Sequence, residues 1–288
     1  MMTSVVRLLI HPATWVCVLL AIAPSSSIID YQEEELERTE LEQKIVPWYA
    51  NSPGHTVFGE YVGAHWCGPC MSSASPSLDN LKTSNPEEFT FVSFFESSSG
   101  GWPSDGPINR QTHIMQSSSG YPTFSFADSQ SGSCYKVGAS GSNYYDSDFS
   151  SGGCMSSSSN DFQLEMSMSL NSSTEEVTIT LDSIYTGPLT SFEVYVYGAV
   201  TEKVGADSYD NGVRPHHNWR GWLLDSADSG FQQLSLSQGV WESHSWTAPL
   251  SLVRAGGGYT QWENFWPVFA LMNGPHSSYN EFLVAIDP

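Results

Sequence analysis

Two cysteines separated by two residues form the clearest chemical motif in the sequence, WCGPC at residues 66–70. The motif follows a strand-like segment over 56–64 and precedes a helix-like segment that runs through Leu81. Cys67 would therefore lie at a helix N-terminus, where free N–H groups and the helix dipole favour a thiolate. Cys70 would lie one turn later, close enough to attack a mixed disulfide. The spacing favours thiol–disulfide exchange.

Two other uses of this cysteine pair stay open. A Cys-x-x-Cys pair can ligate zinc, but a tetrahedral structural site needs two further ligands. Cys134 and Cys154 are too far apart in sequence to form a second such pair, and the adjacent His216 and His217 would point to opposite faces of a strand. An inert structural disulfide is the other alternative. We expect no metal and no organic cofactor.

Strand-like and helix-like segments alternate between residues 51 and 150. We predict strands at 56–64, 88–96, 121–126 and 134–139, and helices after the dithiol motif and over 108–115. This alternation is typical of an α/β domain.

A Ser/Gly linker is predicted over residues 151–160, and the apolar pattern beyond it changes to a period of two. Strand-like segments separated by turn residues then predict an all-β Ig-like antiparallel sandwich over 161–288. These segments are Phe162–Leu170, Val177–Ile184, Ser191–Val200, Gly230–Leu236, Val240–Trp246, Phe265–Met272 and Glu281–Ile286.

The N-terminus has the features of an export signal. Arg7 precedes a short apolar run that ends at Ala23, which predicts a signal peptide over residues 1–25. The run is shorter than the ~20 residues that span a bilayer, although an uncleaved anchor is the alternative. An acidic helical spacer is predicted over 26–50. We therefore expect an exported protein that is periplasmic, extracellular or held at the cell surface.

The charge of the chain excludes one large class of partners. Ten Lys and Arg residues stand against 31 Asp and Glu residues, for a formal net charge of −21. Binding to DNA or RNA depends on basic side chains that neutralise phosphates. We expect no nucleic-acid partner.

Residues 56–150 resemble the thioredoxin superfamily. WCGPC matches the active-site motif of that family, and the segment Tyr121-Pro122-Thr123 matches its proline loop. The resemblance implies an α/β thioredoxin-like domain followed by the sandwich. It also implies that Cys67 is the nucleophile and Cys70 the resolving cysteine.

The same resemblance assigns a substrate-binding role to four residues. Trp66 would flank the dithiol, and a cis Pro122 would face it in a loop with Tyr121 and Thr123, where the substrate chain docks. The loop would hold a protein or peptide substrate beside Cys67.

The sequence departs from this family at several positions. The family's buried aspartate corresponds to Tyr61, and the neighbouring Glu60 would lie on the other face of the strand. The basic residue after the motif corresponds to Met71. These departures remove general-base help for Cys70, which a cationic His65 would restore in part.

Asn211–Arg214, the Trp-rich stretch after it and the late Phe282–Ile286 strand resemble a second set of proteins. These are exported bacterial outer-membrane and surface proteins that pair a thioredoxin-like domain with a C-terminal β-sandwich. The resemblance implies the same export and the same order of domains.

Cys134 and Cys154 flank the strand predicted over 134–139 and a further helix predicted from Tyr144. A helix that runs back along that strand brings its end near the start of the strand, which predicts a structural Cys134–Cys154 disulfide. A second redox couple and two free thiols are the alternatives.

The sequence thus predicts an exported thiol–disulfide oxidoreductase that acts on protein or peptide thiols and disulfides through Cys67 and Cys70, with a membrane or soluble redox partner. The alternative is a non-catalytic surface binding or adhesion protein. In that case the first domain is a scaffold, and the Trp-rich sandwich carries the ligand site.

Overall fold

The computed structural model of the 288-residue chain describes residues 41–49, 56–96, 108–115, 120–126, 134–150, 161–224, 231–274 and 282–288. The predicted signal peptide (1–25), the predicted linker (151–160) and Cys154 lie outside these residues. Within the described ranges, no helix is long and apolar enough to cross a membrane.

Four strands of the first half surround the two cysteines. β2 (Val57–Ala64) pairs in parallel with β3 (Phe89–Glu96) and antiparallel with β4 (Thr123–Phe126), which pairs in turn with the short β5 (Tyr135–Val137). All residues of β2 and β4 are buried, because both faces of this part of the sheet are covered. The four strands lie where the sequence predicts strands.

Helices cover the two faces of these strands. A π-helical turn, η1 (Cys70–Ala74), leads into α3 (Ser75–Ser84), whose Leu78 and Leu81 pack with β2 and β3 on one face. Pro76 is the second residue of α3 and has no N–H to donate to the π-helical turn that precedes it. On the opposite face lies Ile114 of α4 (Ile108–Met115). The short α5 (Asp146–Ser150) adds Phe149 to the first face.

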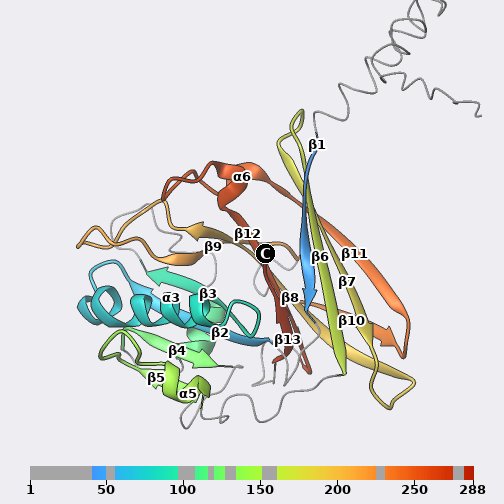
Figure 1. The fold of residues 1–288 in the computed structure, drawn as a ribbon, viewed down its shortest axis with the longest axis horizontal. Helices are drawn as coiled ribbons and strands as arrows, with labels where there is room; N and C mark the ends of the chain where they lie inside the picture. The colour runs from blue at the N-terminus through green and yellow to red at the C-terminus, as the bar shows by residue number, and fades with distance from the viewer. Residues whose placement is uncertain are drawn as a thin grey trace, which may run out of the picture.

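Strands of the second half extend the same sheet. β9 (His216–Trp222) lies in parallel beside β3, with Asn218 opposite Ser93, and the Ser93 hydroxyl donates a hydrogen bond to the carbonyl of His216 over 2.9 Å. The result is a nine-stranded mixed sheet in the order β13-β12-β8-β9-β3-β2-β4-β5, with β10 also paired to β8 (Figure 1). The added strands are β8 (Ser191–Val204), β10 (Phe231–Ser237), β12 (Phe265–Met272) and β13 (Phe282–Ile286).

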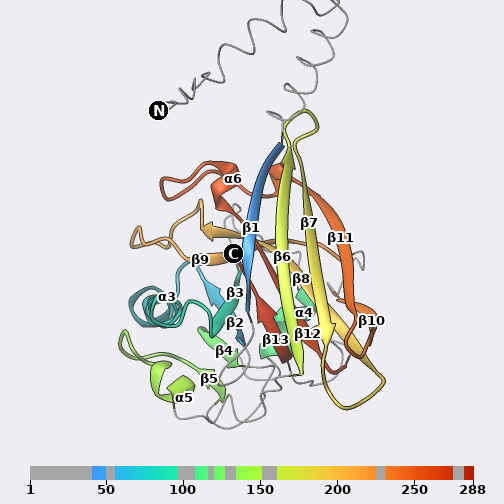
Figure 2. The same cartoon turned by 45° about the vertical axis from the view of Figure 1, so that its right-hand side comes forward.

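A second, antiparallel sheet of four strands packs over the β8 and β12 part of the long sheet (Figure 2). Its inward residues alternate along the strands, as Leu164, Met166 and Met168 do, and they share one apolar core with Val194, Val196 and Phe269. Its strands, in order, are β1 (Leu41–Tyr49), β6 (Phe162–Asn171), β7 (Glu176–Tyr185) and β11 (Trp241–Pro249). The turn after β11 contains η3 (Leu250–Leu252) and α6 (Gln261–Asn264).

The predicted fold class, an α/β thioredoxin-like domain followed by an all-β Ig-like antiparallel sandwich, is wrong. The protein is mostly β, and strands from both halves of the chain form one mixed sheet. One buried cluster joins Phe58 and Phe94 of the first half to Tyr197, Trp266 and Phe282 of the second. The sequence pattern located the strands, but strand pairing over long range decided the architecture.

The prediction of an acidic helical spacer over residues 26–50 is also wrong for the part that the structure describes. Leu41–Tyr49 form strand β1, which pairs antiparallel with β6. Leu41 and Ile45 fit one face of a helix and also one face of a strand, so their spacing does not distinguish the two. Pairing with an available edge outweighed the helix propensity of the glutamates.

Candidate functional site

Cys67 lies in the turn after β2 and Cys70 begins η1. The two are joined by a disulfide, with their Cα atoms 5.2 Å apart. The Cys67 N–H donates to the carbonyl of Ala64 and the Met71 N–H donates to the carbonyl of Cys67, which ties the turn to both elements. Cys67 is 7% exposed and Cys70 is fully buried. An attacking sulfur therefore has access to Cys67 and not to Cys70.

A backbone donor points at the more accessible sulfur. The N–H of Cys70 donates to Sγ of Cys67 over 3.1 Å. This contact forms at the start of the helical segment, where the first N–H groups have no partner within the helix. A donor in this place stabilises negative charge on Cys67 and so favours a Cys67 thiolate when the disulfide opens.

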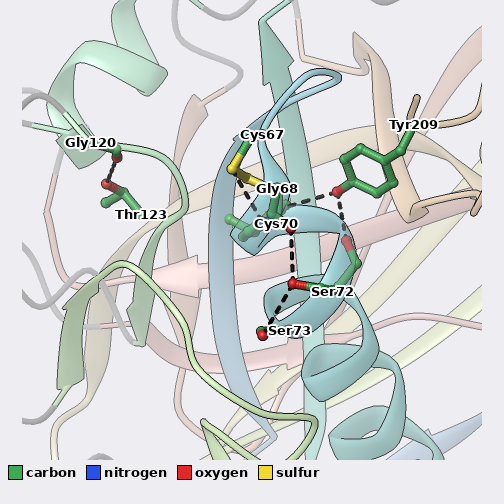
Figure 3. The surroundings of a disulfide bond; sticks show 10 residues. Cys67, Gly68, Cys70, Ser72, Ser73, Gly120, Thr123 and Tyr209 are labelled. Atoms are coloured by element: carbon green, nitrogen blue, oxygen red, sulfur yellow. Dashed lines mark hydrogen bonds between the residues drawn. A yellow bond between two sulfur atoms is a disulfide. The ribbon is translucent and has the colours of Figure 1, made fainter. Parts of the chain in front are cut away.

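The predicted substrate-binding residues lie beside the dithiol. The ring of Trp66, which is 43% exposed, meets the ring of Tyr121 edge to face with 6.3 Å between centroids. The Tyr121–Pro122 peptide bond is cis, and both Pro122 and Thr123 are buried. The Thr123 hydroxyl donates to the carbonyl of Gly120 over 2.7 Å, and Figure 3 shows both residues in the surroundings of the disulfide.

Glu60 and Tyr61 point to opposite faces of β2, as the sequence predicts for neighbours on a strand. Glu60 faces away from the dithiol and is bound by Arg110 of α4, whose Nε donates to Oε1 over 2.8 Å. Both side chains of this ion pair are buried. Tyr61 packs in the cluster that contains both cysteines. The side chain on the dithiol face is therefore a phenol and not a carboxylate.

Tyr209, in the loop between β8 and β9, is a site residue that sequence analysis missed. Its hydroxyl lies 2.6 Å from the Ser75 hydroxyl and 3.4 Å from the Tyr61 hydroxyl. The three hydroxyls form a buried network beside Cys70 within one core cluster. No sequence motif marks Tyr209, because its role depends on a contact between distant parts of the chain.

Burial controls the protonation of the two tyrosines. Desolvation raises the pKa of Tyr61 well above the ordinary value, and the neighbouring Tyr209 raises it further. Burial also raises the pKa of Tyr209, although its hydrogen bonds to Ser75 and Tyr61 act in the opposite direction. Both phenols therefore stay neutral at physiological pH and act as hydroxyl groups, not as phenolate bases.

Hydrogen bonds to a buried carboxylate and one ion pair hold the loop that carries Tyr209. The buried carboxylate of Glu202 accepts hydrogen bonds from the N–H groups of Ala206 and Arg254, over 2.9 and 3.1 Å. The guanidinium of Arg254 donates to both carboxylate oxygens of Asp207. Farther along the loop, the Asp210 N–H reaches the carbonyl of His65 over 3.3 Å. The loop is thus fixed at its base and touches the segment just before the dithiol.

The other predicted site residues lie apart from one another. Cys134 is disulfide-bonded, and its predicted partner Cys154 lies outside the described residues. His216 has its Nδ1 3.1 Å from Asp79, whereas His217 is buried against Phe91. In the part of the chain that the structure describes, no three His, Cys, Asp or Glu residues gather in a way that would hold a metal ion.

Comparisons with solved structures found several matches to this chain. No protein-family model and no curated protein matches this chain. The structure of HBP35 of Porphyromonas gingivalis is similar, with a TM-score of 0.58 and 14% identity over 82% of this chain and 75% of that chain. At this identity the likeness concerns the fold alone. A beta-glucosidase from Kluyveromyces marxianus matches 40% of this chain at a TM-score of 0.22, too low to indicate a shared fold.

Proposed function

We propose that the protein is an exported thiol–disulfide oxidoreductase that acts on protein or peptide substrates through Cys67 and Cys70. The observation that carries this proposal is that the two cysteines differ in exposure and in hydrogen bonding. Cys67 is 7% exposed and has a backbone N–H directed at its sulfur over 3.1 Å, whereas Cys70 is fully buried. An inert disulfide needs neither the access nor the donor.

The reaction proceeds through a mixed disulfide. In one direction the Cys67 thiolate attacks a substrate disulfide, a Cys67–substrate bond forms, and the second substrate sulfur leaves as a thiolate that takes up a proton. Cys70 then loses its proton and attacks Sγ of Cys67. The Cys67–Cys70 bond forms, and the remaining substrate sulfur leaves as a thiol. The substrate disulfide is reduced and the dithiol is oxidised.

The opposite direction uses the oxidised pair. A substrate thiolate attacks Sγ of Cys67, and Cys70 leaves as a thiolate that is protonated. A second substrate thiolate then displaces Cys67 and completes the substrate disulfide. The redox poise of the compartment sets the direction, and a membrane or soluble redox partner restores the starting state. Neither direction needs a metal or an organic cofactor.

In this proposal the substrate binds at Trp66 and at the loop Tyr121-Pro122-Thr123. Pro122 and Thr123 are buried, so Trp66 and Tyr121 are the side chains of this set that a substrate can reach. Trp66 offers an exposed aromatic face next to Cys67, and its edge-to-face contact with Tyr121 holds the ring in place. A substrate segment that packs on Trp66 is held with its sulfur near Cys67. Export of the chain rests on the sequence of residues 1–25 alone.

The test is a redox titration of the exported protein in glutathione and dithiothreitol buffers, with the Cys67 and Cys70 thiols counted by mass tagging. A reversible two-electron couple between about −120 and −270 mV would support the proposal. A bond that resists reduction below about −300 mV would identify a structural disulfide and overturn it. The double variant Cys67→Ser, Cys70→Ser is the control, because any thiols counted in it come from the other cysteines of the chain.

A further inference from the structure

We infer that Tyr209 is a positioning residue for Cys70, so that the second half of the chain controls the resolving step of the dithiol. This inference rests on the proposed thiol–disulfide exchange. Tyr209 lies 134 positions from Ser75 in sequence, yet their hydroxyls are 2.6 Å apart in the buried cluster that contains Cys70.

Tyr209 acts on Cys70 through the backbone of Ser75. The Ser75 N–H donates to the carbonyl of Cys70 and closes the π-helical turn Cys70–Ala74. The Ser75 side chain is the hydrogen-bond partner of Tyr209. The residue that closes the turn around Cys70 is therefore held in place by a side chain from the loop between β8 and β9. Single π-helical turns inside helices are frequent at functional sites.

The Tyr209 hydroxyl is itself held in position. The buried Glu202 and the Arg254–Asp207 pair fix the base of its loop. Beside Tyr209, the N–H of Gly212 donates to the Tyr209 carbonyl over 2.8 Å, and Gly212 has a φ of 82°, a value that other residues rarely adopt. A hydroxyl on a rigid loop can hold Ser75 in a single position, because little conformational freedom remains to be lost.

Closing the disulfide is the step that depends on this arrangement. In the mixed disulfide, Cys70 must reach Sγ of Cys67 from a fully buried position. The effective concentration of Cys70 at that sulfur depends on how closely the turn keeps the geometry of the closed pair. The Tyr209 hydroxyl contacts the Ser75 hydroxyl, so it acts on Cys70 through the residue that closes the turn.

The test measures that effective concentration in glutathione buffers. The protein is equilibrated, quenched with acid, and separated into closed disulfide and glutathione mixed disulfide. Tyr209→Phe keeps the ring and removes the hydroxyl, so the ratio of closed to mixed form should fall about fivefold, as expected for one lost hydrogen bond. A circular dichroism spectrum confirms that the variant is folded.

Tyr145→Phe is the matched control. Tyr145 is buried in the same cluster, and its hydroxyl has no hydrogen-bond partner among the described residues. This variant should leave the ratio unchanged. Ser75→Ala removes the same contact from the other side and should lower the ratio as Tyr209→Phe does, and the double variant should cause no further loss.

The outcomes separate this inference from the proposed function. A protein that forms no glutathione adduct and does not exchange would overturn the proposed function itself. Exchange with equal ratios in the unsubstituted protein and Tyr209→Phe would overturn only the role of Tyr209. An equal fall in Tyr145→Phe would also overturn it, because any change in the core would then have the same effect.

Discussion

The hydroxyls of Tyr209 and Ser75 lie 2.6 Å apart, and they connect the loop between β8 and β9 to the start of α3. The same loop reaches the backbone of His65, two residues before Cys67. Contacts on both sides of the dithiol turn thus come from the second half of the chain. A single loop of the second half therefore contacts the chain on both sides of the dithiol turn.

The two cysteines should behave differently when replaced singly. Cys70→Ser leaves the accessible Cys67 free to form an adduct that cannot be resolved, so this variant should accumulate a stable mixed disulfide with glutathione. Cys67→Ser leaves only the buried Cys70 and should accumulate none. Intact mass after reaction with oxidised glutathione distinguishes the two. An adduct on Cys67→Ser alone would reverse the assigned roles.

Trp66→Ala should impair reaction with peptide disulfides more than reaction with glutathione. Loss of one aromatic contact near the reacting sulfur should lower kcat/KM for a peptide about fivefold. Stability should change little, since Trp66 is 43% exposed. Trp241→Ala on β11 is the matched control, because Trp241 is 46% exposed and lies in the other sheet. An equal loss in both variants would argue against a binding surface at Trp66.

The Glu60–Arg110 ion pair should contribute to stability and not to exchange. Arg110→Ala removes one partner of a buried ion pair and should lower the free energy of unfolding by about 3–5 kcal/mol in urea titrations. Glu60→Gln should also destabilise the protein but leave the pH profile of exchange unchanged, because Glu60 faces away from the dithiol. A shifted pH profile in Glu60→Gln would instead make Glu60 a base for Cys70.

His217 should make the protein less stable in weak acid. Burial holds the pKa of His217 well below its ordinary value, and the charge of Lys82 lowers it further. Above about pH 6.5 the residue is neutral in both the folded and the unfolded state and contributes no pH dependence. Below that pH only the unfolded state takes up the proton, so stability should fall by up to about 1.4 kcal/mol per pH unit.

His217→Asn should remove this part of the pH dependence. Asparagine tolerates the left-handed backbone at this position, where φ is 52°. The comparison is the free energy of unfolding of both proteins in urea between about pH 7.5 and 5.5. Equal slopes for the variant and the unsubstituted protein would show that His217 is not the group responsible.

Local patterns in the sequence located most of the strands. The runs at 56–64 and 88–96 are rich in apolar residues and correspond to β2 and β3, and the alternating run Phe162–Leu170 corresponds to β6. The WCGPC motif and the Tyr121-Pro122-Thr123 segment also lie together beside one turn. The strands depend on residues near one another in sequence, which is where apolar periodicity is informative. The two motifs are far apart in sequence, and their meeting was implied by the family resemblance and not by a local pattern.

Contacts between distant segments were not predictable in the same way. β9 pairs with β3 through one residue pair, Ser93 and Asn218. The sequence of β9 shows no preference for β3 as its neighbour. Tyr209 resembles any other loop tyrosine in the sequence. Part of the segment predicted as a glutamate-rich helix forms strand β1 instead. Its pairing with β6 is a tertiary contact, which local helix propensity does not report.

On the ribosome, β3 is made long before β9, its neighbour in the sheet. Until residues 216–222 emerge, the phenylalanine-rich β3 has an open edge that can pair with other chains. The Tyr209 contact beside Cys70 is completed at the same late stage. A partly synthesised chain therefore carries both cysteines without their final surroundings, and it needs protection from aggregation and from premature disulfide formation until the second half of the protein has arrived.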